Sequence, residues 1–192
     1  MPARSQQDRR DATRAALLQA GRRLFADRGF AAVPADDIVA AAGVTRGALH
    51  HHFKDKRGLF RSVFEQLEAE IAADLGGLLA DGRGDLLRRS LSAFLDICER
   101  SDVRRIALTD APAVLGWKTW REIESEHGLG LLTALLAETR GTDGPAPVHM
   151  HAQLILSSVI EGALFIANAE NQTQAREQVE SSLIALFGHL MD

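Results

Sequence analysis

The 192-residue sequence contains no tyrosine and a single cysteine, Cys98. One cysteine cannot form a disulfide within the chain, and this is typical of proteins in a reducing cytosol. The sequence has no uninterrupted apolar run of about 18 residues, which a membrane-spanning helix would need. Residues 1–10 are polar and basic, without the apolar core of a signal peptide. These absences predict a cytoplasmic protein whose residues 1–10 form a disordered arm.

Aromatic residues make up only 5% of the chain, whereas alanine and leucine are abundant. This composition favours helices over strands, and apolar residues recur at helical spacing along most of the sequence. We therefore expect an all-α fold of about nine helices, with no strand. The expected helices span residues 11–28, 35–42, 46–52, 56–78, 85–100, 102–109, 117–139, 148–169 and 173–190.

Charge is distributed unevenly along the chain, although the net charge is only −4. Residues 1–61 contain twelve Lys and Arg but six acidic residues, giving +6 and leaving −10 for the remainder. Such asymmetry is typical of a module that binds a polyanion and is joined to an acidic body, although chance clustering on solvated faces would give the same numbers. Nucleic acid is the polyanion that the next feature favours.

Two short helices, at residues 35–42 and 46–52, are separated only by Gly43, Val44 and Thr45. Glycine permits the sharp turn because it tolerates positive φ, and Thr45 can cap the second helix. This pattern predicts a helix-turn-helix whose second helix enters the major groove with its N-terminal residues foremost. Thr45, Arg46, Gly47 and Ala48 are expected to face base edges, and His50, His51 and Lys56 to contact phosphates.

The same stretch resembles the signature of the TetR family of bacterial repressors. The resemblance covers roughly residues 11–64 and includes Leu24 to Phe30 and Asp37 to Ala42. Its central run is Gly43-Val44-Thr45-Arg46-Gly47-Ala48-Leu49-His50-His51-His52-Phe53-Lys54-Asp55-Lys56. Beyond residue 64, only the helical layout and the length are similar.

The resemblance implies a mechanism that the residues alone do not show. Family members have three DNA-binding helices and a body of about six more, and the last two helices pair across a dimer as a four-helix bundle. A ligand in the body usually moves the fourth helix and separates the two DNA-binding domains. The DNA is then released, and a nearby gene, often for efflux or detoxification, is expressed.

The sequence departs from the family pattern at two positions. His50 stands where the family usually has an aromatic residue, most often tyrosine, that commonly bonds a phosphate. Val33-Pro34 stands where many members have a threonine or serine that caps the second helix and touches phosphate. Both departures are expected to weaken DNA affinity without changing the interpretation.

A ligand cavity is expected in the body around Trp117 and Trp120, which lie three residues apart on one helix face. Glu161 lies among apolar residues, where a carboxylate needs a partner or a ligand. These residues predict a small apolar or amphipathic ligand with a donor group. The alternatives are plain core packing and, for Glu161, a solvated or dimer-facing position. The full set of candidate ligand residues is Phe94, Cys98, Trp117, Trp120, His127, Glu161, Phe165 and Asn168.

The last two helices carry more apolar residues than one buried face requires, and small residues such as Gly162 would permit close helix approach. We expect a homodimer through residues 148–190, which would space two recognition helices about 34–36 Å apart on a pseudo-palindromic operator. The expected organisation is therefore a disordered arm (1–10), a helix-turn-helix domain (11–55) and a ligand-binding and dimerisation domain (56–192).

Other functions find less support. His50, His51 and His52 are consecutive on a helix, so they point in different directions and cannot bind one metal ion together. An enzyme such as a helical hydrolase or transferase would need a convergent acid–base or nucleophile set, which the sequence does not supply, so no activity and no cofactor are expected. A DNA-binding protein without a small ligand is the remaining alternative, and it predicts a closed, well-packed body.

Overall fold

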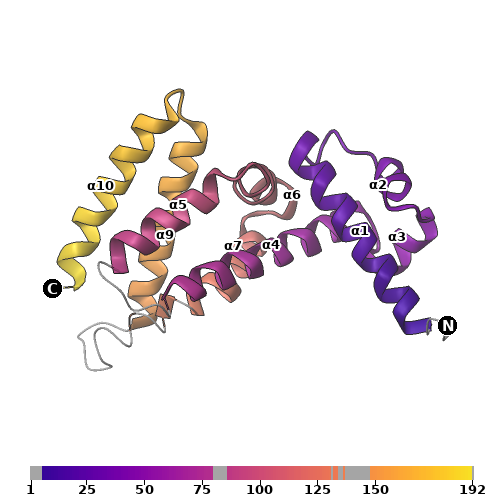
Figure 1. The fold of residues 1–192 in the computed structure, drawn as a ribbon, viewed down its shortest axis with the longest axis horizontal. Coiled ribbons are helices and arrows are strands. Elements are labelled where there is room, and N and C mark those ends of the chain that lie inside the picture. The colour runs from indigo at the N-terminus through magenta and orange to yellow at the C-terminus, as the bar shows by residue number, and fades with distance from the viewer. Residues whose placement is uncertain (1–5, 80–85, 131, 134–135, 137–147, 192) are drawn as a thin grey trace. The chain divides into compact units, whose positions relative to one another are not determined.

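The computed structural model describes residues 6–79, 86–130, 132–133, 136 and 148–191. Within these ranges the regular structure is entirely helical, with nine α-helices, two π-helical segments and no strand, which confirms the expected fold class. The α-helices are α1 (Gln6–Arg28), α2 (Ala35–Ala42), α3 (Arg46–Phe53), α4 (Lys56–Leu79), α5 (Leu86–Glu99), α6 (Ala111–Leu115), α7 (Trp117–Glu124), α9 (Val148–Asn168) and α10 (Gln172–Met191) (Figure 1). The π-helical segments are η1 (Val103–Asp110) and η2 (Ser125–Leu129).

Helix α1 begins earlier than the sequence indicates. Residues 6–10, expected to belong to a disordered arm, form its first turns, so that expectation is wrong for these five residues. Local contacts stabilise the extension: the Gln7 side-chain amide donates to both carboxylate oxygens of Asp11 at 3.1 Å, and the Thr13 hydroxyl donates to the Arg9 carbonyl at 2.9 Å. Residues 1–5 lie outside the described part of the chain.

The expected helices at 102–109 and 117–139 also differ in the structure. The first is the π-helix η1, in which the wider turn is one residue longer than in an α-helix. The second begins at Trp117 but ends as an α-helix at Glu124 and continues as the π-helix η2. Residues 131, 134–135 and 137–139 of that expected helix lie outside the described residues.

The chain divides into two compact units, which we describe separately. Unit 1 comprises residues 1–67 and 101–117, and unit 2 comprises residues 68–100 and 118–192. The boundary therefore falls within α4. Residues 101–117 belong to unit 1, although the residues that precede and follow them belong to unit 2. The expected helix-turn-helix domain, residues 11–55, thus lies within a larger packing unit.

Three phenylalanines form the centre of unit 1. The rings of Phe25 and Phe30 each lie edge-on to Phe60, with centroids 5.2 and 5.1 Å away. Helix α1 approaches α4 closely at Gly21, where an added Cβ would lie 3.1 Å from a Leu59 methyl group. Because α1 and α4 share this apolar surface, α1 provides a fixed base for the short helices α2 and α3, both of which contact it.

Polar contacts fix residues 101–117 to the same unit. Arg22 on α1 forms a 2.7 Å ion pair with Asp102, and the Phe30 amide donates to the Asp110 carboxylate at 2.7 Å. The Arg57 guanidinium donates to the last carbonyls of α6, at Val114 and Leu115, 3.0 and 3.1 Å away. These contacts reach both α1 and α4, so the segment supports the turn that precedes α2.

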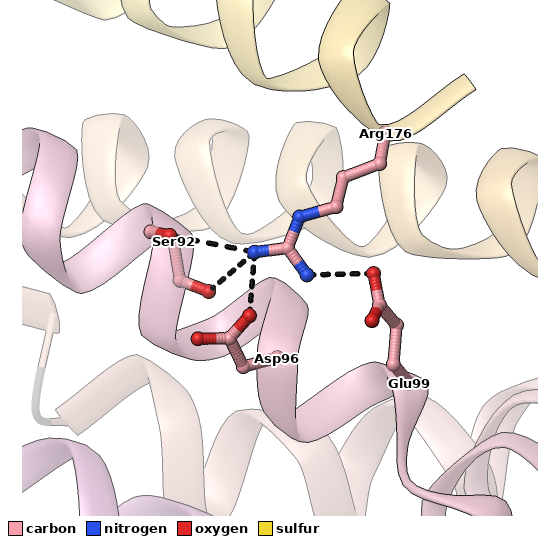
Figure 2. Close-up of polar contacts among 4 residues, drawn as sticks. All are labelled: Ser92, Asp96, Glu99 and Arg176. Atoms are coloured by element: carbon pink, nitrogen blue, oxygen red, sulfur yellow. Dashed lines mark hydrogen bonds and ion pairs between the residues drawn. The ribbon is translucent and has the colours of Figure 1, made fainter. Parts of the chain in front are cut away.

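In unit 2, helices α5, α9 and α10 pack around one apolar cluster. Arg176 on α10 ties that helix to α5: its guanidinium contacts the Glu99 carboxylate at 2.6 Å and the Asp96 carboxylate at 2.5 Å (Figure 2). It also donates to the hydroxyl and carbonyl oxygens of Ser92. The buried residues of the cluster are Leu91, Leu95, Ile166, Ala175, Leu183 and Phe187.

Helix α9 is more apolar than its burial explains. By length and composition it is apolar enough to cross a membrane, although the sequence contains no uninterrupted apolar run of that length. The same composition is found in helices whose faces are covered within or between protein chains. Three of its large apolar side chains, Met150, Leu154 and Phe165, are more than half exposed.

Candidate functional site

The connection between α2 and α3 has the geometry expected of a helix-turn-helix. Gly43 has φ 65° and ψ 32°, the left-handed conformation in which other residues are strained. The amides of Gly43 and Val44 donate back to Ala40 and Val39, at 3.2 and 3.0 Å, and so end α2. The role predicted for Gly43 from the sequence is thus confirmed.

Helix α3 is anchored by its apolar side and exposed at its N-terminal end. Thr45 caps it, because its hydroxyl accepts from the Ala48 amide at 3.3 Å. Leu49 and Phe53 are buried on the side that packs into unit 1. The residues of this helix and its cap that are predicted to contact DNA are accessible to solvent. Ala48 is partly exposed, and the fully exposed ones are Thr45, Arg46, Gly47, His50 and His51.

Two acidic residues in the first turn of α2 pair with different arginines. The Asp36 carboxylate lies 3.5 Å from Nε of Arg46, and both side chains are largely exposed. The Asp37 carboxylate pairs with Arg28 on α1 at 2.7 Å. The preceding Pro34 provides no side-chain hydrogen bond that would cap α2.

A strained turn joins α3 to α4. Lys54 has φ 70° and ψ −56°, and the Asp55 amide donates to the Phe53 carbonyl at 2.9 Å, which together define a γ-turn of the rare positive-φ kind. Nδ1 of His50 lies 2.7 Å from the Lys54 carbonyl oxygen. Because a carbonyl only accepts, Nδ1 carries the proton, and Nε2 of a neutral ring is left as an acceptor. His50 therefore stabilises the turn, and it can donate to a phosphate only as imidazolium.

The structure assigns Lys56 a different role from the expected phosphate contact. Its ammonium group donates to the carbonyls of Phe30 and Val33, both at 2.9 Å, and lies 4.0 Å from the centre of the Phe30 ring. These contacts hold the positive charge of Lys56 against groups within unit 1. The sequence could not show this, because the two acceptors are more than twenty residues away.

The eight candidate ligand residues do not converge on one place. Trp117 belongs to unit 1 and is 63% exposed, so it does not line an interior cavity of unit 2. Glu161, Phe165 and Asn168 are exposed on one stripe of α9 together with Leu154, at spacings of seven, four and three residues. These three residues are therefore not part of an interior cavity, and for Glu161 the exposure agrees with the solvated or dimer-facing alternative.

The other four candidates are buried or partly buried within unit 2. Cys98 and Trp120 are buried, whereas Phe94 is partly buried against the cluster of α5, α9 and α10. His127 is partly buried on η2. Burial, with Glu68, Glu124 and Glu99 nearby, raises the pKa of the Cys98 thiol, so it stays protonated and unreactive.

Sequence reasoning missed a polar group inside unit 2. Glu124 is 5% exposed and bonds Arg121 at 3.0 Å, and Arg121 also donates to the Ser157 hydroxyl at 2.9 Å. Burial raises the pKa of Glu124 to about 7, against the opposing effect of Arg121. Burial, with the Glu124 charge, raises the pKa of Glu68 to about 8.

A signal for one of these residues is present in the sequence. Glu68 follows Phe64 by four residues and precedes Ile71 by three, so it lies on the apolar stripe of α4. Phe64 and Ile71 are buried. A carboxylate at such a position predicts an interior polar site.

Comparison with known proteins agrees with this geometry. Residues 17–63 match the family model described as bacterial regulatory proteins of the tetR family, and residues 85–190 match a tetracyclin repressor-like C-terminal domain. The crystal structure of a TetR-family transcriptional regulator from Pectobacterium atrosepticum is 33% identical, with a TM-score of 0.81 over 98% of each chain.

Curated relatives extend the similarity over most of the chain. The transcriptional repressor AcnR of Corynebacterium efficiens is 26% identical over 89% of this chain and 92% of its own. The Tn10 TetC protein of Escherichia coli is 28% identical over 69% of this chain and 68% of its own. AcnR and the Pectobacterium protein are named as transcriptional regulators, and both halves of the sequence match family models. The chain therefore belongs to the TetR family of bacterial transcriptional regulators.

Proposed function

We propose that this protein is a ligand-responsive repressor that binds a pseudo-palindromic operator as a homodimer. The observation that carries the proposal is the exposure of Thr45, Arg46 and Gly47 at the N-terminal end of α3. The buried residues Leu49 and Phe53 hold this helix in unit 1. A guanidinium at such a position can donate two hydrogen bonds to a guanine edge. The name of AcnR, a repressor, supports the direction of regulation.

The proposed DNA contacts fall into two groups. Thr45, Arg46, Gly47 and Ala48 would face base edges, and His50 and His51 would contact phosphates. The net charge of +6 on residues 1–61 would strengthen the attraction to any duplex. Lys56 is left out of this set because its ammonium group is bonded within unit 1.

The proposed dimer uses α9 and α10, within residues 148–190. The exposed stripe of α9 and the exposed Leu186 on α10 supply apolar surface that a second copy would cover. The two helices approach closely at Gly162, where an added Cβ would lie 2.6 Å from a Val179 methyl group. A face of this kind would account for the apolar composition of α9.

The proposed ligand is a small apolar or amphipathic molecule that binds inside unit 2. Trp120 and Cys98 supply apolar surface there, and Glu68 and Glu124 could accept hydrogen bonds from a donor group. The proposed site involves α4, α5 and α7, and Arg121, the partner of Glu124, also donates to Ser157 on α9. The family resemblance supports release of DNA on ligand binding.

The first test is selection of a binding site from random duplexes, followed by fluorescence anisotropy at two salt concentrations. We expect the selected duplex to have two-fold symmetry, and binding to weaken steeply in salt. Arg46→Ala should bind selected and shuffled duplexes alike. Equal binding of wild type to both duplexes would contradict the proposal. Compounds that release the selected duplex would then identify the ligand class.

A further inference from the structure

The exposed Arg46 at the start of α3 has an acidic neighbour that comes from another helix. Nε of Arg46 lies 3.5 Å from the Asp36 carboxylate, with 72% and 68% of the two side chains exposed. Ion pairs this exposed contribute little to stability, because water screens them. We therefore expect Asp36 to affect the DNA contacts of Arg46 rather than the stability of the fold.

Asp37, the next residue, shows what a purely structural acid does at this place. Its carboxylate is 2.7 Å from Arg28, whose guanidinium also donates to the Ala32 carbonyl at 2.9 Å. This pair joins the end of α1 to the start of α2. Both acids lie in the first turn of α2, where the helix dipole favours a negative charge. They differ in that only Asp36 contacts a residue expected to face a base.

The contact with Asp36 uses only one side of the guanidinium. An arginine has one donor on Nε and two on each terminal nitrogen, and the terminal pair can bond both acceptors of a guanine edge. With Nε facing a carboxylate, the terminal nitrogens of Arg46 remain available. The carboxylate also restricts the rotation of a long side chain that would otherwise sample many orientations.

The negative charge of Asp36 also opposes nonspecific binding to DNA. A lone arginine at the surface of a DNA-binding helix can bond any phosphate oxygen, and such contacts carry no sequence information. A carboxylate beside it repels phosphates and reduces this competing mode. Both effects act in the same direction, because one favours the base contact and the other disfavours the backbone contact.

We propose that Asp36 is a positioning residue that orients Arg46 toward a base edge and thereby increases sequence discrimination. The proposal rests on the DNA-reading function proposed above. It predicts that removing the Asp36 charge will increase DNA affinity overall while reducing the preference for the operator.

The experiment compares Asp36→Asn with Asp37→Asn, which makes the same charge change one residue away. Anisotropy is measured with the duplex selected by the wild-type protein and with a shuffled duplex of equal length, at one salt concentration. We expect the affinity ratio between the two duplexes to fall about fivefold for Asp36→Asn, the upper end of what an exposed ion pair contributes. For Asp37→Asn the ratio should stay within about twofold of wild type, since only the general charge changes.

A second comparison, made in an Arg46→Ala protein, separates the positioning of Arg46 from the general effect of the Asp36 charge on DNA binding. In this Arg46→Ala protein, which should bind both duplexes alike, Asp36→Asn should raise both affinities by the same factor, because there is no arginine to orient. An affinity ratio that stays at the wild-type value in Asp36→Asn, or that falls equally in Asp37→Asn, would overturn the proposal. If wild type itself does not discriminate between the duplexes, the DNA-reading function fails instead. Circular dichroism of each variant checks that the helices are intact.

Discussion

Glu68 should make the stability of unit 2 fall as pH rises. Its folded-state pKa is about 8, against an ordinary value of 4.5, because burial and the Glu124 charge disfavour its ionised form. Below about pH 4.5 the carboxyl is protonated in both states and pH has no effect through this group. Between about pH 5 and 8 the folded state holds a proton that the unfolded state has released, so each pH unit lowers the free energy of unfolding by about 1.4 kcal/mol.

The full shift corresponds to an upper limit of about 5 kcal/mol, since one pKa unit is equivalent to about 1.4 kcal/mol. Glu68 is only partly buried, so water and local relaxation reduce this value. We expect wild type to lose about 2–3 kcal/mol between pH 5.5 and 8 through this group. Glu68→Gln, which resembles the protonated acid, should reduce this dependence to the smaller part that Glu124 contributes and should be more stable than wild type at pH 8.

The assay is urea unfolding followed by tryptophan fluorescence in a Trp117→Phe background. Trp117 belongs to unit 1 and Trp120 to unit 2, so the remaining fluorescence reports unit 2. Protein concentration is kept constant, because dimerisation contributes to apparent stability. Glu122→Gln is the matched control, since Glu122 is 61% exposed in its ion pair with Lys118. A pH dependence that survives in Glu68→Gln as it does in the control would refute the reasoning.

Three further predictions concern single contacts. Asp110→Ala leaves the Phe30 amide without its acceptor and should cost about 1–3 kcal/mol, measured by chemical denaturation; no loss would show that water replaces the carboxylate. Lys54→Gly should raise the thermal midpoint by relieving a positive φ that costs about 1–3 kcal/mol, and a lower midpoint would contradict the strain. Phe165→Glu should convert a dimer to a monomer in analytical ultracentrifugation while helicity is retained, whereas an unchanged dimer would remove α9 from the interface.

Local features of the DNA-binding region could be predicted from the sequence. The Gly43 turn, the Thr45 cap and the cap at Asp55, which accepts from the Gly58 amide at 2.7 Å, each depend on residues at most a few positions apart. Hydrogen bonds of this kind are encoded by residue type and spacing, so sequence reasoning reaches them. The same holds for the all-α fold class.

Contacts between distant segments could not be predicted in this way. Lys56 was assigned to phosphate because it begins a helix, but its charge is held by carbonyls that only the folded chain brings near. From the sequence, Glu161 and Phe165 are expected to line one cavity with Trp120, but the folded chain exposes the first two and buries the third. Helical spacing shows that residues share a face, but it does not show what that face contacts.

The sequence by itself determined the helix-turn-helix, the residues exposed at its tip and the family, because these depend on local geometry and on one contiguous motif. Tertiary structure alone decided which residues share an interior. It joined residues 101–117 to the DNA-binding unit, brought Asp36 beside Arg46, and placed Glu68 and Glu124 within electrostatic reach of Cys98. The physical reason is that burial and pairing depend on distances between segments, and the periodicity of one helix does not specify those distances.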